Sequence, residues 1–403
     1  MTEYAQGGRR CGVSRIPPPD RGETEITNTT RGHEASTGGD TMINGMLGRC
    51  IAVTGAALLA GGNVAFAQSS GVQLYGVVTA GISQKTNQTG GTTQFGNYLL
   101  NSSYLGLRGS EDLGGGLRAT FQLETGVETG TGEAGSGSKF WNRHATAGLA
   151  NGQFALTLGR QFHASTDRVT RSLDAFNVSG ASLHVTPLAL FGVNKFMNND
   201  NRSDNTIKLR WNGPAGVTAA LSTAPDHDSG RSMGFDLAQV TRNYVVALYG
   251  VRFKSPNPVA ATGQRPEHRV LGAGGQYRVG QAVLYLNVAR SSLEASAAGR
   301  PKQTNTLLIP GIRYNMLPFV LKASYTLDSG KNINNVAGRD GKKKTLIAAI
   351  EYHLSKRTAV AFAVFRNSFT DGYKLDPVNI AALARDPESS STSGYAMGLR
   401  HNF

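Results

Sequence analysis

The stretch Ser393-Gly-Tyr-Ala-Met-Gly-Leu-Arg-His-Asn-Phe403 decides the predicted fold, because its side chains alternate in character along its length. Apolar side chains fall on one face: Tyr395, Met397, Leu399 and Phe403. Small or polar residues fall on the other: Ala396, Gly398, Arg400 and Asn402. A period of two residues is typical of a half-buried β-strand. A strand that stops at an aromatic residue is typical of the closing strand of a transmembrane β-barrel, because the ring can lie in the aromatic girdle at the membrane boundary.

The other end of the chain predicts an export signal. Residues 1–41 are polar and contain no apolar run, which indicates a disordered extension or a start-site artefact. Our hypothesis is that translation starts at Met42 or Met46, and a peptide from Met1 in the precursor would contradict it. Residues 42–67 combine a basic residue, a short apolar stretch and the small-x-small sequence Ala65-Phe-Ala67, as in a signal peptide. We therefore expect residues 68–403 to form the mature β-barrel.

Composition narrows the class of the mature part. Both cysteines, Cys11 and Cys50, precede Ala67, so we expect no disulfide, thiolate chemistry or cysteine–metal site in the mature part. We also expect no cofactor. The first 67 residues contain as many acidic as basic residues, so the net charge of +14 belongs to the remainder. No apolar run is long enough for a membrane-spanning helix. We find no convincing helical periodicity, whereas Gly-rich and Thr-rich alternation suits a barrel with a wet interior.

Four segments show the strand alternation most clearly. They are Leu117–Glu124, Ile207–Trp211, Leu321–Leu327 and Leu346–Leu354. In each one, apolar side chains alternate with a face that carries charged or polar residues. Charged side chains need water, so the minor face is predicted to line a lumen, and the apolar face to meet lipid.

The connections between these strands are of two kinds. Seven are short turns: Glu111–Gly116, Ala150–Gln153, Asn212–Gly216, Val240–Asn243, Val279–Gln281, Asn315–Pro318 and Leu354–Arg357. Eight are long and polar: Lys85–Tyr98, Gly130–Lys139, Gln161–Asp204, Thr223–Arg231, Ser255–Arg269, Leu293–Gln303, Asp328–Lys343 and Ser368–Ser391. Fifteen connections join sixteen strands. Long loops on one side and short turns on the other predict an all-β, 16-stranded antiparallel barrel of the outer membrane, wide enough for an aqueous channel.

Ordered motifs along the chain carry a family resemblance. They are Leu74-Tyr-Gly-Val-Val78, Leu105-Gly-Leu-Arg-Gly-Ser-Glu-Asp-Leu-Gly-Gly-Gly-Leu117, Thr157-Leu-Gly-Arg-Gln161, Asp204-Asn-Thr-Ile207, Leu354-Ser-Lys-Arg-Thr358 and Gly398-Leu-Arg-His-Asn-Phe403. Together they resemble Gram-negative general porins of the β-proteobacterial type, over essentially all of residues 68–403. The resemblance implies a trimeric porin that lets small hydrophilic solutes and ions diffuse, with its third loop folded into the lumen. Tyr104 and His144 stand where the family often has arginine, which argues against a strong anion selectivity. The net charge of +14 predicts a mild anion preference.

The lumen offers candidate pore-lining residues. The longest loop, Gln161–Asp204, is the expected constriction, with acidic Asp167 and Asp174 and the weakly titratable His163 and His184. The facing wall would supply the remaining candidates: Arg108, Arg118, Glu124, His144, Lys208 and Arg210. Opposed charges across a narrow gap would create a transverse field that orders dipolar solutes. The alternative for each basic residue is a solvated lumen side chain without influence on flux, and for the two aspartates a loop that faces the outside.

Other functions are weighed against diffusion. A substrate-specific channel for a sugar, amino acid or organic anion would favour an aromatic ladder or a ring of like charges, and the sequence shows neither. A barrel enzyme would need a catalytic set, and His144 and His353 have no obvious triad partners, so we expect no enzyme. Nucleic acid is not an expected partner, because the basic residues are spread along strands. Reconstitution in planar bilayers separates these functions: stepwise conductance for diffusion, saturable block for a specific channel, hydrolysis without conductance for an enzyme.

The expected location and partners follow from the barrel. We expect the protein in the Gram-negative outer membrane, as a homotrimer in contact with lipid and lipopolysaccharide. Lys342, Lys343 and Lys344 would lie in a surface loop, where they either contact anionic lipopolysaccharide or are merely solvated.

Overall fold

The computed structural model describes residues 71–97, 100–135, 138–176, 202–225, 230–255, 259 and 261–403. All of the described residues belong to one compact unit. The predicted extension and signal peptide therefore lie outside the described residues.

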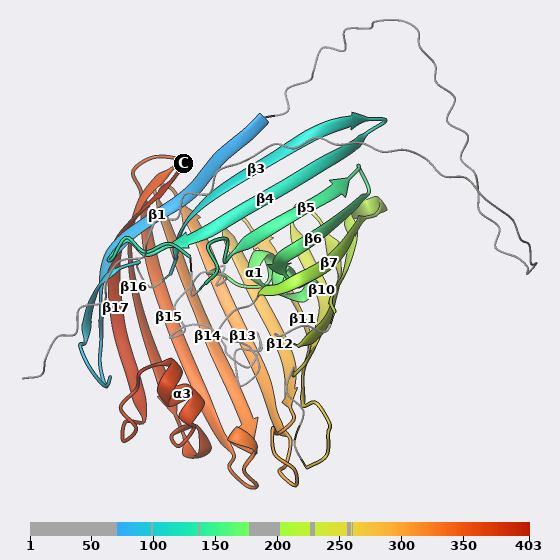
Figure 1. Ribbon diagram of the computed structural model, residues 1–403. Helices are drawn as coiled ribbons and strands as arrows, with labels where there is room; N and C mark the ends of the chain where they lie inside the picture. Colours follow the sequence, from blue (N-terminus) through green and yellow to red (C-terminus); the bar gives the residue numbers. More distant parts are fainter. Residues whose placement is uncertain are drawn as a thin grey trace, which may run out of the picture. The chain divides into compact units, whose positions relative to one another are not determined.

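The described residues form one antiparallel sheet of seventeen strands (Figure 1). Sixteen of them make the wall: β1 (Gly71–Lys85), β3 (Ser103–Gly114), β4 (Leu117–Val127), β5 (His144–Ala150), β6 (Phe154–Phe162), β7 (Arg202–Asn212), β8 (Val217–Ala224), β9 (Arg231–Val240), β10 (Tyr244–Lys254), β11 (Glu267–Val279), β12 (Ala282–Leu293), β13 (Gln303–Met316), β14 (Phe319–Lys331), β15 (Gly341–His353), β16 (Thr358–Phe369) and β17 (Ser391–Asn402). The seventeenth, β2 (Thr93–Gly96), is a short strand of the first long loop and pairs with β1.

The sheet closes on itself, because β17 pairs with β1 from Val77↔Asn402 to Lys85↔Gly394. Beyond this ladder, Gly76 and Phe403 exchange two backbone hydrogen bonds of 3.1 Å. Closure removes the free edges that an open sheet would expose in lipid. The predicted 16-stranded antiparallel barrel is confirmed, and the stretch that ends at Phe403 is its closing strand.

The two kinds of connection are also confirmed. Short turns join the strands at one end, and the turn between β3 and β4 uses Gly114, Gly115 and Gly116, all with positive φ. The other end has eight long loops, which contain α1 (Ala164–Ser172), η3 (Ile333–Asn335), η4 (Asp371–Tyr373) and α3 (Pro377–Ala382). The helical periodicity of α1 and α3 escaped the sequence analysis because both helices are short. Among the described residues, no helix is both long and apolar enough to cross a membrane.

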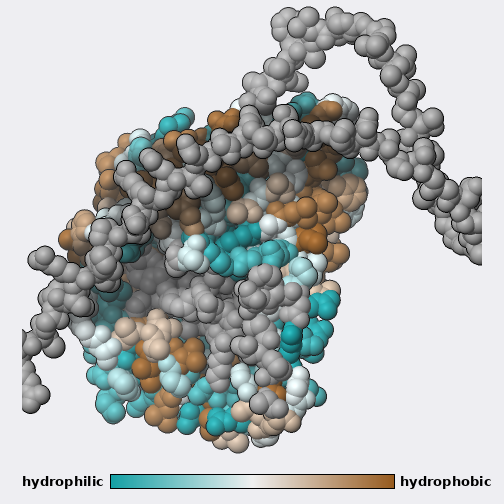
Figure 2. All heavy atoms as spheres, viewed as in Figure 1, coloured by the Kyte–Doolittle hydropathy of each residue, from teal (hydrophilic) through white to brown (hydrophobic). Residues whose placement is uncertain are grey.

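Hydrophobic side chains cover the outer face of the wall. On β1, Leu74, Val78 and Ile82 are exposed on the outer face. The other strands of the wall likewise carry exposed apolar side chains on this face. In Figure 2, hydrophobic residues, in brown, gather in the upper part of the view, where β3, β4 and β5 lie. Exposed aromatic residues lie close to the short turns: Phe154, Tyr244, Tyr277, Tyr314, Tyr352 and Phe403. This row is the aromatic girdle expected at one membrane boundary.

Two features of the wall differ from the sequence analysis. The three lysines predicted in a loop belong to β15: Lys342 and Lys344 are exposed on its outer face, whereas Lys343 is buried on the inner face. The ladder of β15 with β14 and β16 continues through them, so the loop is shorter than predicted. The inner face of β10 is apolar rather than wet, with buried Val245, Ala247, Tyr249, Val251 and Phe253, because part of the third loop packs against it.

Candidate functional site

The described part of the third loop, residues 163–176, lies inside the ring of strands. Its apolar residues Val169, Leu173 and Phe176 belong to one buried cluster with residues of β9 to β17, which only an element within the ring can reach. Ala164 donates its backbone N–H to Ser222 Oγ on β8 at 3.0 Å. At the other end, Ala175 lies over Gly311 of β13, where an added Cβ would be 3.2 Å from the Ala175 methyl group. The loop therefore follows the inner wall from β8 to β13.

The sequence of α1 accounts for its helical form. Asp167 lies in the first turn and Arg171 in the last, and both charges complement the helix dipole. The two side chains are four residues apart and approach to 3.5 Å, which is the spacing of a stabilising helix pair. The helix is short, and its packing against β8, β9 and β10 supplies the rest of its stability.

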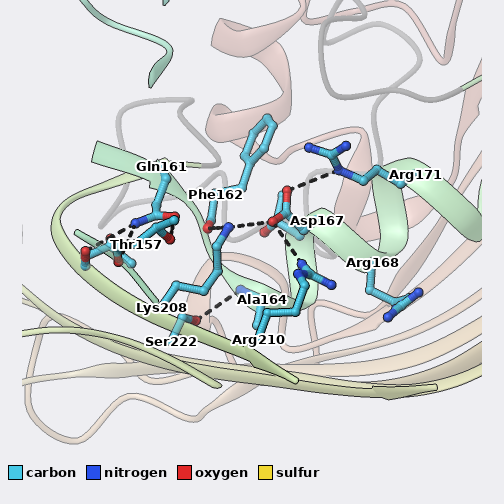
Figure 3. Close-up of polar contacts among 12 residues, drawn as sticks. Thr157, Gln161, Phe162, Ala164, Asp167, Arg168, Arg171, Lys208, Arg210 and Ser222 are labelled. Atoms are coloured by element: carbon cyan, nitrogen blue, oxygen red, sulfur yellow. Dashed lines mark hydrogen bonds and ion pairs between the residues drawn. The ribbon is translucent and has the colours of Figure 1, made fainter. Parts of the chain in front are cut away.

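Asp167 is the centre of a network of ion pairs (Figure 3). Lys208 Nζ donates to Asp167 Oδ2 at 2.5 Å and to the carbonyl oxygen of Phe162 at 3.1 Å. Arg210 approaches the same carboxylate oxygen at 3.4 Å. Burial alone would raise the pKa of Asp167, but the positive charges of Lys208, Arg171 and Arg210 together hold it below its ordinary value. Asp167 and Lys208 were expected to face each other across a gap, but they are in contact.

A second ion pair ties α1 to β9. Arg168 donates from Nε and from a terminal nitrogen to Asp236 Oδ1 at 3.0 and 2.7 Å, and also to Thr218 Oγ1 on β8 at 2.8 Å. Asp236 is buried on the inner face of β9, so this pair is shielded from the lumen. Removing one partner of such a buried pair leaves an uncompensated charge, which makes the pair a strong anchor for α1.

His163 does not present a titratable group to the lumen, contrary to the expectation. Its side chain is fully buried, and Nε2 is 2.6 Å from Ser203 Oγ on β7. Burial, together with the positive charge of Lys208, lowers the pKa of His163 to about 3. The imidazole is therefore neutral at physiological pH. His184 lies outside the described residues.

Glu124 is enclosed by other side chains of the β1–β5 wall. It forms an ion pair with Arg143, and Tyr75 donates its hydroxyl to the second carboxylate oxygen at 3.1 Å. The Arg108 guanidinium lies over the ring of Tyr75, 4.7 Å from its centroid, and donates to Gln73 at 2.9 Å. Arg108 and Glu124 thus lie on the same inner surface of the wall, but the charge of Glu124 is compensated there.

The other predicted site residues, His144, Asp174 and Arg118, differ in their burial and in their distance from α1. His144 is buried, with its ring edge-on to Phe162 at a centroid distance of 5.4 Å. Asp174 is half-buried just after α1, and its carboxylate accepts the backbone N–H of Phe176 at 3.2 Å. Arg118 is exposed beside the short turn between β3 and β4. It lies six residues from Glu124 along β4, and the rise per residue of a β-strand makes this separation about 20 Å. The structure therefore does not bring Arg118 to the level of α1.

A polar cavity of about 350 Å³ lies between α1 and the wall. Its lining contains Gln122, His144, Thr146, Ala155, Thr157, Gln161, Asp167, Arg168, Arg171, Ser172, Lys208 and Arg210. Sequence reasoning missed Arg143, Arg168 and Arg171. The Asp167-x-x-x-Arg171 spacing is the signal that could have identified the last two, because it indicates a helix in the loop.

A closed barrel with a hydrophobic outer face, a charged inner face and a loop inside it defines the class of outer-membrane channels. The family model described as Gram-negative porin matches residues 52–372, and the chain belongs to this family.

Several known proteins are similar to the chain. Outer membrane porin protein 32 of Delftia acidovorans is 26% identical over 358 residues, covering 86% of this chain and 98% of that protein. An outer membrane porin protein of Bordetella pertussis is 25% identical, with the same coverage of both chains. Among solved structures, an anion-selective porin from Comamonas acidovorans has a TM-score of 0.69 and 21% identity, over 83% of this chain and all of that one. OmpT of Vibrio cholerae, in a trimer form, has a TM-score of 0.60 and 13% identity, over 83% and 100%.

These findings confirm the predicted family, fold and location. The protein is an outer-membrane channel for the passive diffusion of small hydrophilic solutes and ions.

Proposed function

We propose that α1 and the wall that it faces form the constriction of this channel, and that an excess of positive charge there gives a mild anion preference. The proposed pore-lining residues are those predicted from the sequence, Arg108, Arg118, Glu124, His144, Asp167, Asp174, Lys208 and Arg210, together with Arg143 and Arg171. Arg118 acts in this proposal at the mouth beside the short turns rather than at the level of α1.

The observation that carries the proposal is the unequal exposure of the two signs of charge around α1. The side chain of Arg171 is 71% exposed, whereas that of Asp167 is 6% exposed and that of Asp236 is fully buried. Glu124 is equally enclosed beneath Arg143. A solute in the lumen therefore meets guanidinium groups first, and fixed charges along a narrow path set ion selectivity. The anion-selective porin named above supports the proposal as a structure with a similar fold.

The channel works by lowering a desolvation cost. Moving a polar solute into the hydrocarbon of a bilayer costs several kcal/mol for each unsatisfied polar group. A water-filled lumen lined with charged groups keeps the solute hydrated along the whole path. The proposal assigns transport alone to the protein, with no bond made or broken.

The reversal potential of single channels under a potassium chloride gradient tests the proposal. We expect the sign that corresponds to chloride moving more readily than potassium, with a permeability ratio modestly above unity. Arg171→Gln removes the most exposed charge on α1 and is expected to bring the ratio closer to unity. Arg366→Gln removes an exposed charge from the outer face of β16 and serves as the matched control. A preference for potassium in the unmodified protein would refute the assignment.

We further propose that the protein is a homotrimer whose subunits meet through the strands on either side of the closure. Among the described residues, the outer faces of β17, β1, β3, β4 and β5 carry apolar side chains and no lysine or arginine. The surface is mainly apolar, with the acidic Glu111 of β3 beside the short turn. Such a surface suits a permanent subunit contact. The trimer form of OmpT, which has a similar fold, supports this arrangement. Native mass spectrometry is expected to give the mass of three chains, and a single-chain mass after gentle extraction would contradict the proposal.

We also propose that residues 42–67 are a signal peptide, removed after Ala67, and that residues 1–41 precede the true start of translation. The support is the small-x-small sequence at Ala65–Ala67, close before β1. Amino-terminal sequencing of the membrane protein is expected to begin at Gln68. A mature protein that still contains residues of the apolar stretch would contradict this.

A further inference from the structure

Three arginines lie side by side on the outer face of the barrel, near its long loops. Arg252 on β10 is directly opposite Arg269 on β11, and Arg290 on β12 is opposite Leu271, the next outward residue of β11. All three alternate with buried inner-face residues, and each lies within three residues of the long-loop end of its strand. We call this set the outer arginine row.

Like charges on directly opposite strand positions repel each other, so this arrangement needs a counterion. Glu267 supplies one negative charge: Arg252 forms an ion pair with it, and Arg269 Nε donates to Glu267 Oε2 at 2.8 Å. Within the described residues, Arg290 has no hydrogen bond or ion pair. The side chains of Arg252 and Arg269 remain 49% and 57% exposed, so their free N–H groups point to the surroundings. A second carboxylate, Glu294, accepts the backbone N–H of Glu267 at 3.1 Å and pairs with Lys302 at 3.1 Å. The row and these neighbours therefore place four basic side chains against two carboxylates, which leaves room for an anionic group.

An apolar groove adjoins the row. It has a volume of about 810 Å³ and crosses the strands of the outer face from β7 to β12. Leu209, Leu221, Met233 and Leu271 line it, and all four are exposed on the outer face. The ring of Phe235 lies over Gly250, where an added Cβ would come within 2.6 Å of it, so this glycine keeps the groove open. An apolar groove that ends at exposed arginines matches an amphiphile with acyl chains and an anionic head.

The position of the outer arginine row on the barrel indicates that lipid, rather than another subunit, contacts it. Strand β10 is eight strands away from β1 in either direction around the sheet, and so lies opposite the closure. The strands beside the closure carry no outward lysine or arginine among their described residues, whereas Lys342, Lys344 and Arg366 continue the basic surface on β15 and β16. If the subunits of a trimer meet at the closure, the basic surface lies on the part of the barrel that faces lipid. This step rests on the proposed trimer.

We propose that the groove and the outer arginine row form a binding site for a phosphorylated, multiply acylated glycolipid of the outer leaflet. The acyl chains lie in the groove, and the phosphate groups of the head bind the guanidinium groups of Arg252, Arg269 and Arg290. Planar guanidinium groups bind phosphate through paired hydrogen bonds, and these bonds are strong at the membrane boundary, where water is scarce. The long loops mark this end of the barrel as the outer-leaflet side.

Native mass spectrometry of the full protein with added bisphosphorylated lipid A tests the site. We expect the unmodified protein to bind this lipid about tenfold more tightly than its dephosphorylated form, since each basic residue near a charged head contributes substantially. Arg252→Gln with Arg290→Gln keeps the Arg269–Glu267 pair and is expected to abolish that difference. Lys356→Gln with Arg357→Gln removes two exposed charges at a short turn, and is expected to bind as the unmodified protein does.

Each contrary outcome has a distinct meaning in the same spectra. Equal binding of the two lipid forms by the unmodified protein, or undiminished binding by the Arg252/Arg290 variant, would overturn the site. Equally tight binding of a bisphosphorylated glucosamine disaccharide without acyl chains would overturn the assignment to a lipid. A spectrum that shows three chains with no preference for phosphate rejects the site alone. If the Arg252/Arg290 variant separates into single chains, the row is a subunit contact, and both the site and the proposed trimer arrangement fail.

Discussion

Gly76→Leu is expected to reduce the yield of folded barrel at least tenfold, because it blocks the closure of the sheet. A Cβ at Gly76 would overlap the backbone carbonyl oxygen of Tyr104 and the ring of Phe403. The ring can rotate away, but the carbonyl oxygen is fixed by the ladder between β1 and β3. Overpacking costs about 1–3 kcal/mol even where neighbours can move, and here the same residue also carries the two hydrogen bonds to Phe403.

The measurement is the fraction of heat-modifiable, folded protein after refolding into detergent or lipid. Val78→Leu is the matched control, because Val78 is the next outward residue on β1 and is exposed. It is expected to fold as the unmodified protein does. If Gly76→Leu folds with the same yield as Val78→Leu, the packing described at the closure is wrong.

Asp167→Asn is expected to increase the preference for anions severalfold and to make the current noisier. The substitution removes the carboxylate shared by Lys208, Arg210 and Arg171, and leaves the buried Lys208 ammonium without its ion-pair partner. Breaking a buried pair in this way costs about 3 kcal/mol, which weakens the attachment of α1 to β7. Single-channel recordings give both quantities: the reversal potential under a salt gradient, and the open-channel noise. Glu388→Gln, an exposed residue of the last long loop, is the charge-matched control.

The pH dependence of the unmodified channel gives a second test of Asp167. Its pKa is held below the ordinary value of 3.8, so the carboxylate stays ionised from neutral pH down to that value. A carboxyl group with a lowered pKa stabilises the attachment of α1 above pH 3.8, and this stabilisation is lost as the pH falls through the lower pKa of the folded state. We therefore expect selectivity to be constant between pH 7 and about pH 5, with stronger anion preference only in more acidic solution. Asp167→Asn is expected to lack the acidic change. A selectivity change centred between about pH 5 and pH 7 would contradict the described environment of Asp167.

The fold was largely predictable because the membrane imposes a simple rule on each strand. Outward residues contact lipid and inward residues contact water. Segments such as Leu117–Glu124 can therefore be identified as strands from the alternation of apolar and polar side chains alone. Turns and loops were predictable for the same reason, as the breaks between alternating segments. The inner face of β16 is largely apolar, with buried Ala361, Ala363 and Phe365, and that of β10 is apolar throughout. On β10 the period-two signal disappears because the third loop, and not water, covers Tyr249 and its neighbours.

The site was less predictable, since it depends on contacts between residues far apart in the chain. The sequence identified Asp167 and Lys208 as candidates by their charge, but their separation of 41 residues gives no hint that they are in contact. His163 was expected to titrate, and its burial against Ser203 could not be known before the path of the loop. Arg168 and Arg171 were missed because a nine-residue helix is too short for a clear periodicity. The pore-lining roles themselves remain a prediction.

Thiol labelling of two adjacent positions tests most directly the claim that wetted and lipid-facing side chains alternate around an open lumen. Because both cysteines of the chain precede residue 68, a single cysteine can be introduced at Arg210 or at Leu209 and observed alone in the mature protein. Arg210 faces α1, and Leu209 is exposed on the outer face. With a charged, water-soluble thiol reagent in a planar bilayer, the account predicts stepwise loss of conductance for Arg210→Cys and no reaction for Leu209→Cys. Equal labelling of both positions, or block through Leu209→Cys alone, would contradict it.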